Sequence, residues 1–352
     1  MKILALLSDA FGADGGIARF NRELIDALAA MPEVECVDVL CRHPARRQEP
    51  LPPKVAQASA GGGRAGYAAL ALWQVLASKH DLVLCGHLHL APLAATAAAI
   101  RRAPLWVQLH GIEAWQRPGP LRARAVERAT LVTAVSRYTR RRFLEWAALE
   151  PHRVRVLPNT VEPRFAPGPR HAKLAERLGL HGKRALLTVG RLAAAEQYKG
   201  HERVIRALPQ LAPDVCYLVV GDGDDRGRLE ALAREQGVGA RVVFAGRVAH
   251  EELVEFYRLA DAFVMPSSGE GFGIVYLEAA ACALPVLGSR EAGAVDALAD
   301  GAIGAFAPAD AEGLVEALRA VLSGAPPDPR RVERFARERF ARHVGGLLGA
   351  FA

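Results

Sequence analysis

Residues 262–278, AFVMPSSGEGFGIVYLE, hold a strand-length apolar run, a glycine-containing loop and an apolar helix start in that order. The run at 262–265 ends at Pro266, and the helical pattern begins after Gly273. A strand followed by a loop and a helix predicts one βα unit of a parallel sheet.

The same alternation extends through the chain in both directions. The apolar runs are 3–7, 34–40, 82–85, 105–108, 131–134 and 154–157 in the first half, and 185–189, 217–220, 242–244, 262–265 and 286–288 in the second. Helical patterns such as 17–30, 201–211 and 226–236 separate them. Two such series predict an α/β protein with two doubly wound, Rossmann-like parallel-sheet domains. Ligands of such sheets bind at the carboxyl ends of the strands, so we expect a site in the cleft where two such domains face each other.

The domain boundary is predicted near residues 158–170, PNTVEPRFAPGPR, where four prolines and a glycine interrupt both periodicities. We therefore expect domains over 1–165 and 166–331. The proline-rich segment 325–329, APPDP, precedes a last helix over about 332–352. That helix is expected to cross back onto the first domain.

Composition narrows the class of protein. Of the 352 residues, 51% are hydrophobic and 24% charged, an ordinary globular composition. No uninterrupted apolar stretch has the roughly 18 residues needed to span a bilayer, and no signal peptide is recognised. The five cysteines contain no C-x-x-C pair, which favours reduced thiols. We expect a cytoplasmic protein. Peripheral contact with the inner face of the membrane is left open.

Charge is unevenly distributed. Residues 1–165 carry 22 Lys and Arg against 14 Asp and Glu, whereas the remainder carries 23 against 24. The basic half fits a phosphorylated acceptor, an anionic membrane or nucleic acid, or simply a solvated arginine-rich surface.

Glu270 and Glu278 are the strongest candidates for ligand contacts. The glycines around Glu270 allow the backbone to approach a ligand closely, and the helix start after them offers free N–H groups. A carboxylate on an apolar helix needs a partner, and a pair of ligand hydroxyls is a suitable one. The alternative is that Glu270 caps the helix and Glu278 forms an internal ion pair.

This stretch resembles the retaining glycosyltransferases of family 4, which have the GT-B fold. Glu270 and Glu278 reproduce that family's E-x7-E motif, and EGFGIVYLEA is similar to it almost residue for residue. The resemblance implies a nucleotide-sugar donor held mainly by the C-terminal half. Through this motif it implies donor contacts at Glu270, Gly271, Phe272, Gly273, Ile274, Val275 and Glu278.

A second motif follows the apolar run 185–189. Gly190 and Arg191 begin a loop that reaches Lys199 before a helix, and two cations at a helix start suit a diphosphate. An ion pair between Lys199 and Glu196 is the alternative. The resemblance implies that Arg191 and Lys199 contact the donor phosphates, with Arg191 the safer assignment because an alanine-rich insertion at 193–195 stretches the pattern.

Two further loops are assigned to the donor by resemblance. Gly15 and Gly16 leave bare backbone at a helix start, which fits either an anion cradle or a plain turn. The resemblance implies that they face the donor phosphates, and that Arg247 and Val248 lie near the nucleotide base.

Histidines follow two strands of the first half. A lone His is more often structural, but the resemblance places His110 beside the transferred sugar. Glu113 is a weaker candidate, and His87 and His89 are expected at the acceptor side. Their H-x-H spacing has no third ligand at a convincing spacing, so no metal site is predicted.

The resemblance implies a retaining hexosyltransferase, and Arg191 and Lys199 at the diphosphate favour a metal-independent one. It would move a sugar from GDP-mannose or a UDP-sugar to a hydroxyl of a glycan or lipid-linked acceptor, in polysaccharide or envelope glycan synthesis. The expected catalytic residues are His110, Arg191, Lys199 and Glu270. The nucleotide-sugar is a co-substrate, and no cofactor or nucleic-acid partner is expected. The alternatives are an epimerase or phosphorylase of the same architecture, or a non-catalytic protein that binds sugar nucleotides or nucleic acid.

Residues 136–146, SRYTRRRFLEW, predict a basic helix with an aromatic and apolar side. Such a helix suits an anionic bilayer surface. The alternative is that its apolar side packs on the first sheet and its arginines are solvated.

Overall fold

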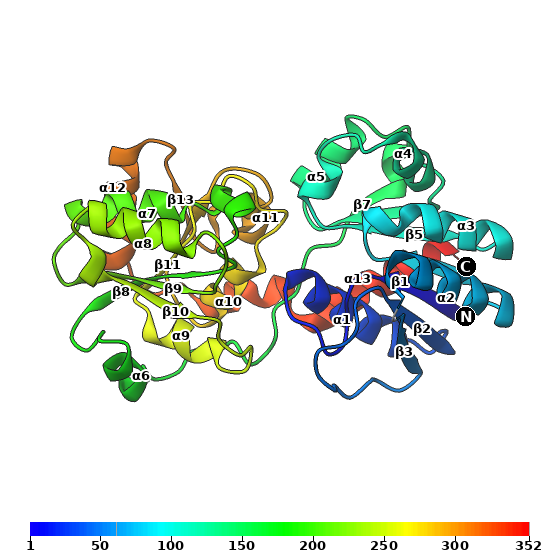
Figure 1. The fold of residues 1–352 in the computed structure, drawn as a ribbon, viewed down its shortest axis with the longest axis horizontal. Coiled ribbons are helices and arrows are strands. Elements are labelled where there is room, and N and C mark those ends of the chain that lie inside the picture. Colours follow the sequence, from blue (N-terminus) through cyan, green and yellow to red (C-terminus); the bar gives the residue numbers. More distant parts are fainter. Residues whose placement is uncertain (61, 352) are drawn as a thin grey trace. The chain divides into compact units, whose positions relative to one another are not determined.

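The computed structural model describes residues 1–60 and 62–351, and they form two compact units (Figure 1). The first comprises residues up to Thr160 together with the chain from Arg337 onward, and the second comprises Val161–Ala336. The division thus lies five residues before the expected position, and the last helix belongs to the first unit. The expectation of two doubly wound α/β domains is confirmed.

The N-terminal unit is built on a parallel seven-stranded sheet of order β3-β2-β1-β4-β5-β6-β7. Its strands are β1 (Lys2–Leu7), β2 (Cys36–Cys41), β3 (Val55–Ser59), β4 (Leu82–Cys85), β5 (Leu105–Leu109), β6 (Leu131–Ala134) and β7 (Val154–Val156). Its helices are α1 (Gly16–Ala29), α2 (Gly63–Ala77), α3 (Ala91–Arg101), α4 (Pro120–Val126), α5 (Arg137–Leu144) and α13 (Arg337–Leu348).

The C-terminal unit has a parallel six-stranded sheet of order β10-β9-β8-β11-β12-β13. Its strands are β8 (Arg184–Val189), β9 (Val215–Val220), β10 (Val242–Gly246), β11 (Ala262–Val264), β12 (Val286–Ser289) and β13 (Ala305–Ala307). Its helices are α6 (Ala172–Arg177), α7 (His201–Ala207), α8 (Arg226–Glu235), α9 (Leu253–Leu259), α10 (Ile274–Ala281), α11 (Ala294–Ala297) and α12 (Ala311–Ser323).

The central strands are buried because helices cover both faces of each sheet (Figure 1). Every residue of β9 is buried, as is Ile3–Leu7 of β1. Strands covered on both faces read as continuous apolar runs, which is why they were visible in the sequence. Two edge strands, β3 and β13, were not expected. Each pairs with one neighbour only, and β3 (VAQAS) is half exposed, so it carries no apolar run.

Helix α13 packs beside α1 in the N-terminal unit. The ring of Phe340 lies edge-on to Phe20 at 5.7 Å between centroids, and Arg337 pairs with Glu23. These contacts explain why the last helix belongs to the first unit. None of the helices in the described residues combines the length and apolarity needed to cross a bilayer.

Candidate active site

Both sheets reverse their strand order at one position, and the candidate residues follow the strands on either side of it. In the C-terminal unit the order changes between β8 and β11, which precede the loops of Lys199 and Glu270. In the N-terminal unit it changes between β1 and β4, which precede Gly15 and His87. Such switch points at the carboxyl ends of parallel strands are where these folds bind ligands.

Lys199 lies at the centre of the C-terminal group. Its Nζ is 3.1 Å from Oε1 of Glu270 and 3.7 Å from Oε2 of Glu196, and all three side chains are only 13% exposed. Burial is the largest influence on the pKa of Lys199 and lowers it, but the two carboxylates raise it, and the pKa lies above its usual value. Lys199 is therefore a charged, largely buried ammonium at neutral pH, as a diphosphate site requires.

Arg191 is placed differently from Lys199. Its side chain is 79% exposed and pairs with Glu196. The sequence favoured Arg191 as the safer phosphate residue, yet Lys199 is the one held among carboxylates at the switch point. The alternative prediction was an ion pair of Lys199 with Glu196. This pair is present, but it is longer than the contact of Lys199 with Glu270.

Glycines allow the neighbouring loops to pass close to one another. A Cβ on Gly221 would lie 1.8 Å from the carbonyl oxygen of Gly190, and one on Gly293 would lie 1.9 Å from that of Gly271. The N–H of Gly293 also donates to the carbonyl of Glu270 at 2.8 Å. The loops after β8, β9, β11 and β12 thus form one packed surface around Lys199.

The start of α10 has no side-chain cap. Gly273 occupies its N-cap position with φ of 91°, and Ile274 and Val275 are partly exposed. The ring of Phe272 is buried, with its centroid 5.8 Å from that of Phe335, so this side chain is not available to a ligand. Uncapped N–H groups at this end of a helix favour an anion or a hydroxyl oxygen.

Glu278 is fully buried and accepts a hydrogen bond of 2.6 Å from the hydroxyl of Tyr257. The motif placed Glu278 on the donor. The structure gives it a partner within the protein, the hydroxyl of Tyr257. Contact with a ligand hydroxyl stays a prediction. Arg247 and Val248 follow β10, and Arg247 is exposed.

The histidines of the N-terminal unit come together at the ends of β4 and β5. The rings of His87 and His110 stack at 6.0 Å, and those of His87 and His89 lie 4.7 Å apart. His110 Nε2 is 2.9 Å from the carbonyl oxygen of Gly86. Burial lowers the pKa of all three imidazoles below the usual value. They are therefore neutral at pH 7 and suited to hydrogen bonding with uncharged groups.

Glu113 and the Gly15–Gly16 turn complete this group. Oε1 of Glu113 accepts the backbone N–H of His110 at 2.6 Å, so this carboxylate orients the turn that carries His110. Gly15 is the N-cap of α1 with φ of 107°, and a Cβ on either glycine would meet nothing within 4 Å. The bare backbone expected from the sequence is present. No group of three or more His, Cys, Asp or Glu in residues 1–60 and 62–351 is arranged to hold a metal ion.

The basic helix expected to meet a membrane is α5, and its apolar side packs inward. Phe143 is buried in the core, and Leu144 and Trp146 pack against it. Arg140 donates to the carbonyls of Val154 and Pro151 at 2.6 and 2.8 Å. The geometry of α5 therefore agrees with the alternative interpretation, in which the helix covers the sheet.

Comparison with known proteins now identifies the family. Residues 14–165 match the family described as "Glycosyltransferase Family 4", and residues 172–339 match "Glycosyl transferases group 1". The chain belongs to glycosyltransferase family 4. The resemblance drawn from the E-x7-E motif is confirmed, and the protein is a glycosyltransferase.

Several relatives are similar over much of the chain. A GDP-mannose-dependent alpha-(1-6)-phosphatidylinositol monomannoside mannosyltransferase of Mycolicibacterium smegmatis is 36% identical over 73% of this chain and 70% of its own. The enzyme of that name from Mycobacterium tuberculosis is 33% identical over 71% of each chain. Among solved structures, HepE of Anabaena in complex with UDP and glucose superposes with a TM-score of 0.79 at 23% identity, over 99% of this chain and 100% of that one. This likeness confirms the GT-B fold of the glycosyltransferase.

Two tyrosines of the site were missed by sequence reasoning. Tyr198 lies against Gly269, where a Cβ would be 2.7 Å from its ring, and its carbonyl accepts the N–H of Ser268 at 2.9 Å. Tyr257 holds Glu278. Neither tyrosine could be found from the sequence, because its partner belongs to a different element of the fold.

Proposed function

We propose that this glycosyltransferase transfers mannose from GDP-mannose, with retention of the anomeric configuration and without a metal ion, to a hydroxyl of a lipid-linked or other glycan acceptor. The observation that carries the proposal is the buried, charged Lys199 among Glu196 and Glu270 at the switch point of the C-terminal unit. The choice of mannose rests on the relatives at 33–36% identity, which are described as GDP-mannose-dependent. A UDP-sugar remains the competing donor.

Lys199 is proposed to stabilise the departing diphosphate. In the absence of donor its charge is balanced by Glu270 and Glu196, so the cation is in position before the donor binds. A preorganised charge of this kind acts where charge develops in the transition state. Arg191, with its exposed side chain, is proposed to supply a second contact from the solvent side.

Retention is proposed to proceed by a front-face reaction through an oxocarbenium-like state. Double displacement needs a carboxylate nucleophile close to the acid. Glu270 is paired with Lys199 and Glu278 is buried against Tyr257, so both are occupied by protein partners. The leaving diphosphate would then accept the proton of the acceptor hydroxyl. Neutral His110 is proposed to hydrogen-bond a hydroxyl of the transferred sugar.

The test is product formation by the purified chain. It is incubated with GDP-mannose, UDP-glucose, UDP-galactose or ADP-glucose, with mannosyl-lipid and soluble mannoside acceptors, with and without EDTA. We expect GDP release that depends on the acceptor and an α-linked mannoside by NMR. A β-linked product would overturn the proposed retention, and preference for another nucleotide would overturn the choice of GDP-mannose. Conversion of donor without acceptor would favour an epimerase, and binding without turnover would favour a non-catalytic protein.

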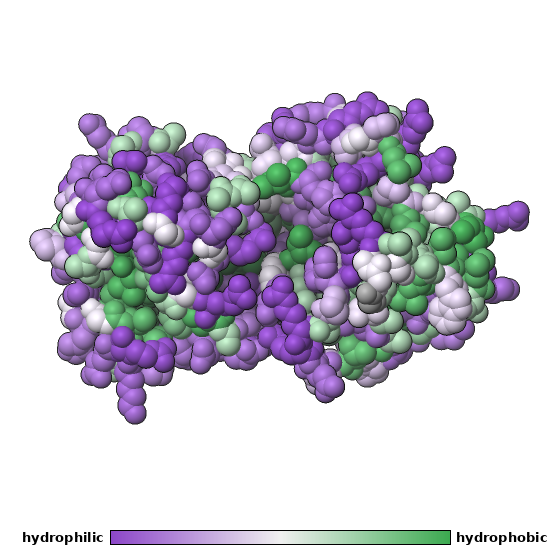
Figure 2. Space-filling view, viewed as in Figure 1, coloured by the Kyte–Doolittle hydropathy of each residue, from purple (hydrophilic) through white to green (hydrophobic). Residues whose placement is uncertain are grey.

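We further propose that membrane contact, if the acceptor is lipid-linked, uses helices α2 and α3 rather than α5. Trp73, Leu76 and Ile100 are 62%, 71% and 46% exposed, and Figure 2 shows an apolar surface over these helices at the right. The exposed Lys79 and Arg102 lie at the ends of these helices. Apolar side chains flanked by cations fit an anionic interface.

Co-sedimentation with vesicles tests this surface. We expect binding to phosphatidylglycerol vesicles and not to phosphatidylcholine vesicles, and loss of binding in Trp73→Ser/Leu76→Ser. Loss in Arg141→Gln/Arg142→Gln instead, with Trp73→Ser/Leu76→Ser unaffected, would return the contact to α5.

A further inference from the structure

A groove between strand β7 and helix α13 is lined by none of the residues proposed for the transfer reaction. It has a volume of about 700 Å³, and its floor includes Leu131 and Leu347. Cationic or imidazole side chains line its walls: His152, Arg153, Arg155, Arg342 and His343. None of the residues lining it is acidic.

Two of these arginines lack a counter-ion. Within residues 1–60 and 62–351, the side chains of Arg155 and Arg342 form no hydrogen bond or ion pair, whereas the side chain of Arg153 donates to the carbonyls of Ala129 and Thr130. Like charges that line one concave surface repel each other, and an anion between them relieves that repulsion. The positive charge of the groove is thus not balanced by any side chain that lines it, and an anionic ligand would balance it.

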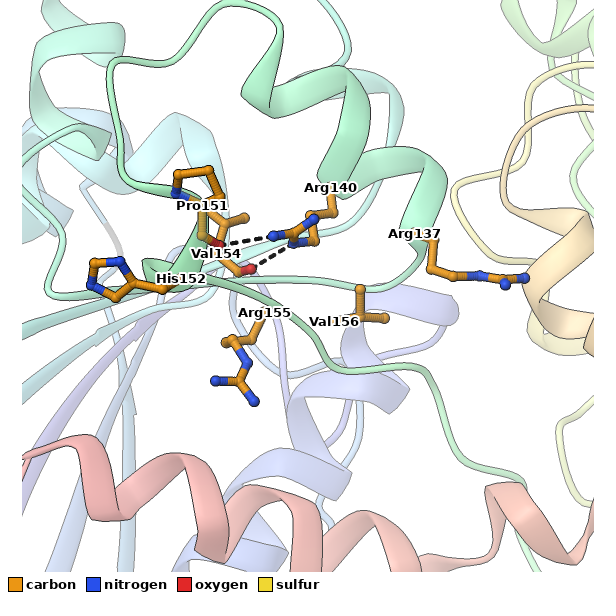
Figure 3. Close-up of a pocket in the computed structure, with 7 residues that line it drawn as sticks. All are labelled: Arg137, Arg140, Pro151, His152, Val154, Arg155 and Val156. Carbon is orange, nitrogen blue, oxygen red and sulfur yellow. Dashed lines mark hydrogen bonds between the residues drawn. The ribbon is translucent and has the colours of Figure 1, made fainter.

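The basic surface continues around β7 into a second, smaller cavity (Figure 3). His152 and Arg155 line both cavities. In Figure 3 the guanidinium of Arg140 is fixed by the carbonyls of Val154 and Pro151, while Arg155 points away from it on the side of α13. Arg140 therefore holds the backbone at the start of β7, whereas the side chain of Arg155 is available to a ligand.

Gly346 keeps the helix side of the groove open. It lies one turn after Arg342 in the interior of α13, where glycine is less favourable than alanine. A Cβ at this position would meet nothing within 4 Å, so packing does not require glycine there. The missing side chain leaves space beside the unpaired guanidinium.

We propose that this groove binds a phosphate monoester or diester group, separately from the nucleotide-sugar, through Arg155 and Arg342. The planar guanidinium presents two parallel N–H donors that match a phosphate. Leu131 and Leu347 offer apolar contact to the organic part of the same ligand. The phosphate belongs either to a small soluble molecule or to a lipid headgroup.

Proton uptake should accompany binding. Burial lowers the pKa of His343, and the charge of Arg155 lowers it further. His152, Arg153 and Arg342 also face the groove and are the other groups that a bound anion would influence. A bound phosphate opposes the repulsion from the arginines, so it raises the pKa of His343 toward the usual value.

The first experiment is a histidine NMR titration of the full chain with glycerol 3-phosphate, at pH 6 and pH 8. We expect saturable shifts of the His343 and His152 signals and a raised His343 pKa. Arg155→Gln and Arg342→Gln should each weaken binding by at least about tenfold, the size of a hydrogen bond to a charged group. Arg124→Gln, which removes an exposed charge from α4, should leave binding unchanged.

Gly346→Glu provides a second variant that leaves both arginines in place. Its carboxylate enters open space beside Arg342 and should compete with phosphate without disturbing the fold, as checked by circular dichroism. GDP at a concentration that saturates the donor site should not displace glycerol 3-phosphate. Displacement by GDP would mean that the phosphate occupies the donor site, and would overturn the proposal.

The lipid arm uses phosphatidylglycerol vesicles in place of glycerol 3-phosphate. Vesicle binding that is lost in Arg155→Gln and Gly346→Glu, with no response to glycerol 3-phosphate, identifies a lipid headgroup as the source. Vesicle binding that depends only on Trp73 and Leu76, with no response of His343 to either probe, overturns the proposal while leaving the transfer reaction untouched.

Discussion

The two strand-order switch points of this glycosyltransferase have the same topology and opposite electrostatics. In the C-terminal unit a buried lysine keeps its charge, because carboxylates surround it. In the N-terminal unit three histidines are neutral, because burial lowers the pKa of each by more than the nearby carboxylate of Glu113 raises it. Glu113 is itself bonded to the backbone N–H of His110.

This difference separates two kinds of recognition. A preformed cation suits the charge of a departing diphosphate, whereas neutral imidazoles suit sugar hydroxyls. Similar parallel sheets thus present either a buried cation or neutral imidazoles, depending on which partner side chains the loops bring to the buried polar group. The predictions below test whether the two switch points differ in this way.

The largest effect is expected from Lys199→Met. This change removes the buried cation and takes from Glu270 the counter-charge of Lys199, while Glu196 keeps its ion pair with Arg191. We expect kcat for transfer to fall by about 10²–10³, as when one preorganised stabilising group is lost. Lys173→Met, on the exposed part of α6, is the matched control. A kcat within the error of the parent would show that the diphosphate is stabilised elsewhere.

Glu278→Ala should affect both nucleotide binding and stability. We expect GDP affinity to fall by about 1.5–3 kcal/mol if the carboxylate contacts ribose hydroxyls. The hydroxyl of Tyr257 also loses its buried acceptor, at a cost of about 1–3 kcal/mol in the free energy of unfolding. Tyr257→Phe removes only the internal bond, and Glu235→Ala removes an exposed carboxylate from the same unit. Calorimetry that finds unchanged GDP affinity in Glu278→Ala would make Glu278 a structural residue.

The histidine group predicts acid sensitivity of the N-terminal unit. Its imidazoles are neutral when folded and have a pKa near 6.5 when unfolded, so the unfolded chain binds more protons below that pH. Stability should be fully present above about pH 6.5 and fall by at most about 1.4 kcal/mol per pH unit for each buried imidazole below it. All four tryptophans, Trp73, Trp106, Trp115 and Trp146, belong to this unit.

Tryptophan fluorescence therefore reports the unfolding of the N-terminal unit alone. His201, in the other unit, has a pKa lowered to about 4 by burial and does not enter this signal. We expect His110→Gln to weaken the dependence of the melting temperature on pH between 7 and 5. A wild-type melting temperature that rises on acidification would show that these histidines are charged when folded.

The smallest effect is expected from chelation. If Lys199 supplies the positive charge for the diphosphate, EDTA should leave turnover unchanged. Loss of turnover that Mg²⁺ or Mn²⁺ restores would mean that a metal ion shares this role, and that the contrast between the two switch points is incomplete.

Much of the fold was predictable because buried parallel strands are continuous apolar runs. The strands β4 and β6 were predicted to the residue, and the loops after β8 and β11 were identified as candidate ligand sites. The strand β3 was missed because it is half exposed and carries no apolar run, and β13 was missed because it is only three residues long.

The family motif, the basic N-terminal half and the strand-end position of the candidate residues were determined by the sequence alone, since each depends on neighbours along the chain. Only the tertiary structure decided that Lys199 pairs with Glu270, 71 positions away, and that Tyr257 holds Glu278. It also decided that the apolar side of α5 faces the core. The physical reason is that the order and register of parallel strands bring distant loops together, and no local periodicity encodes which side chains then meet.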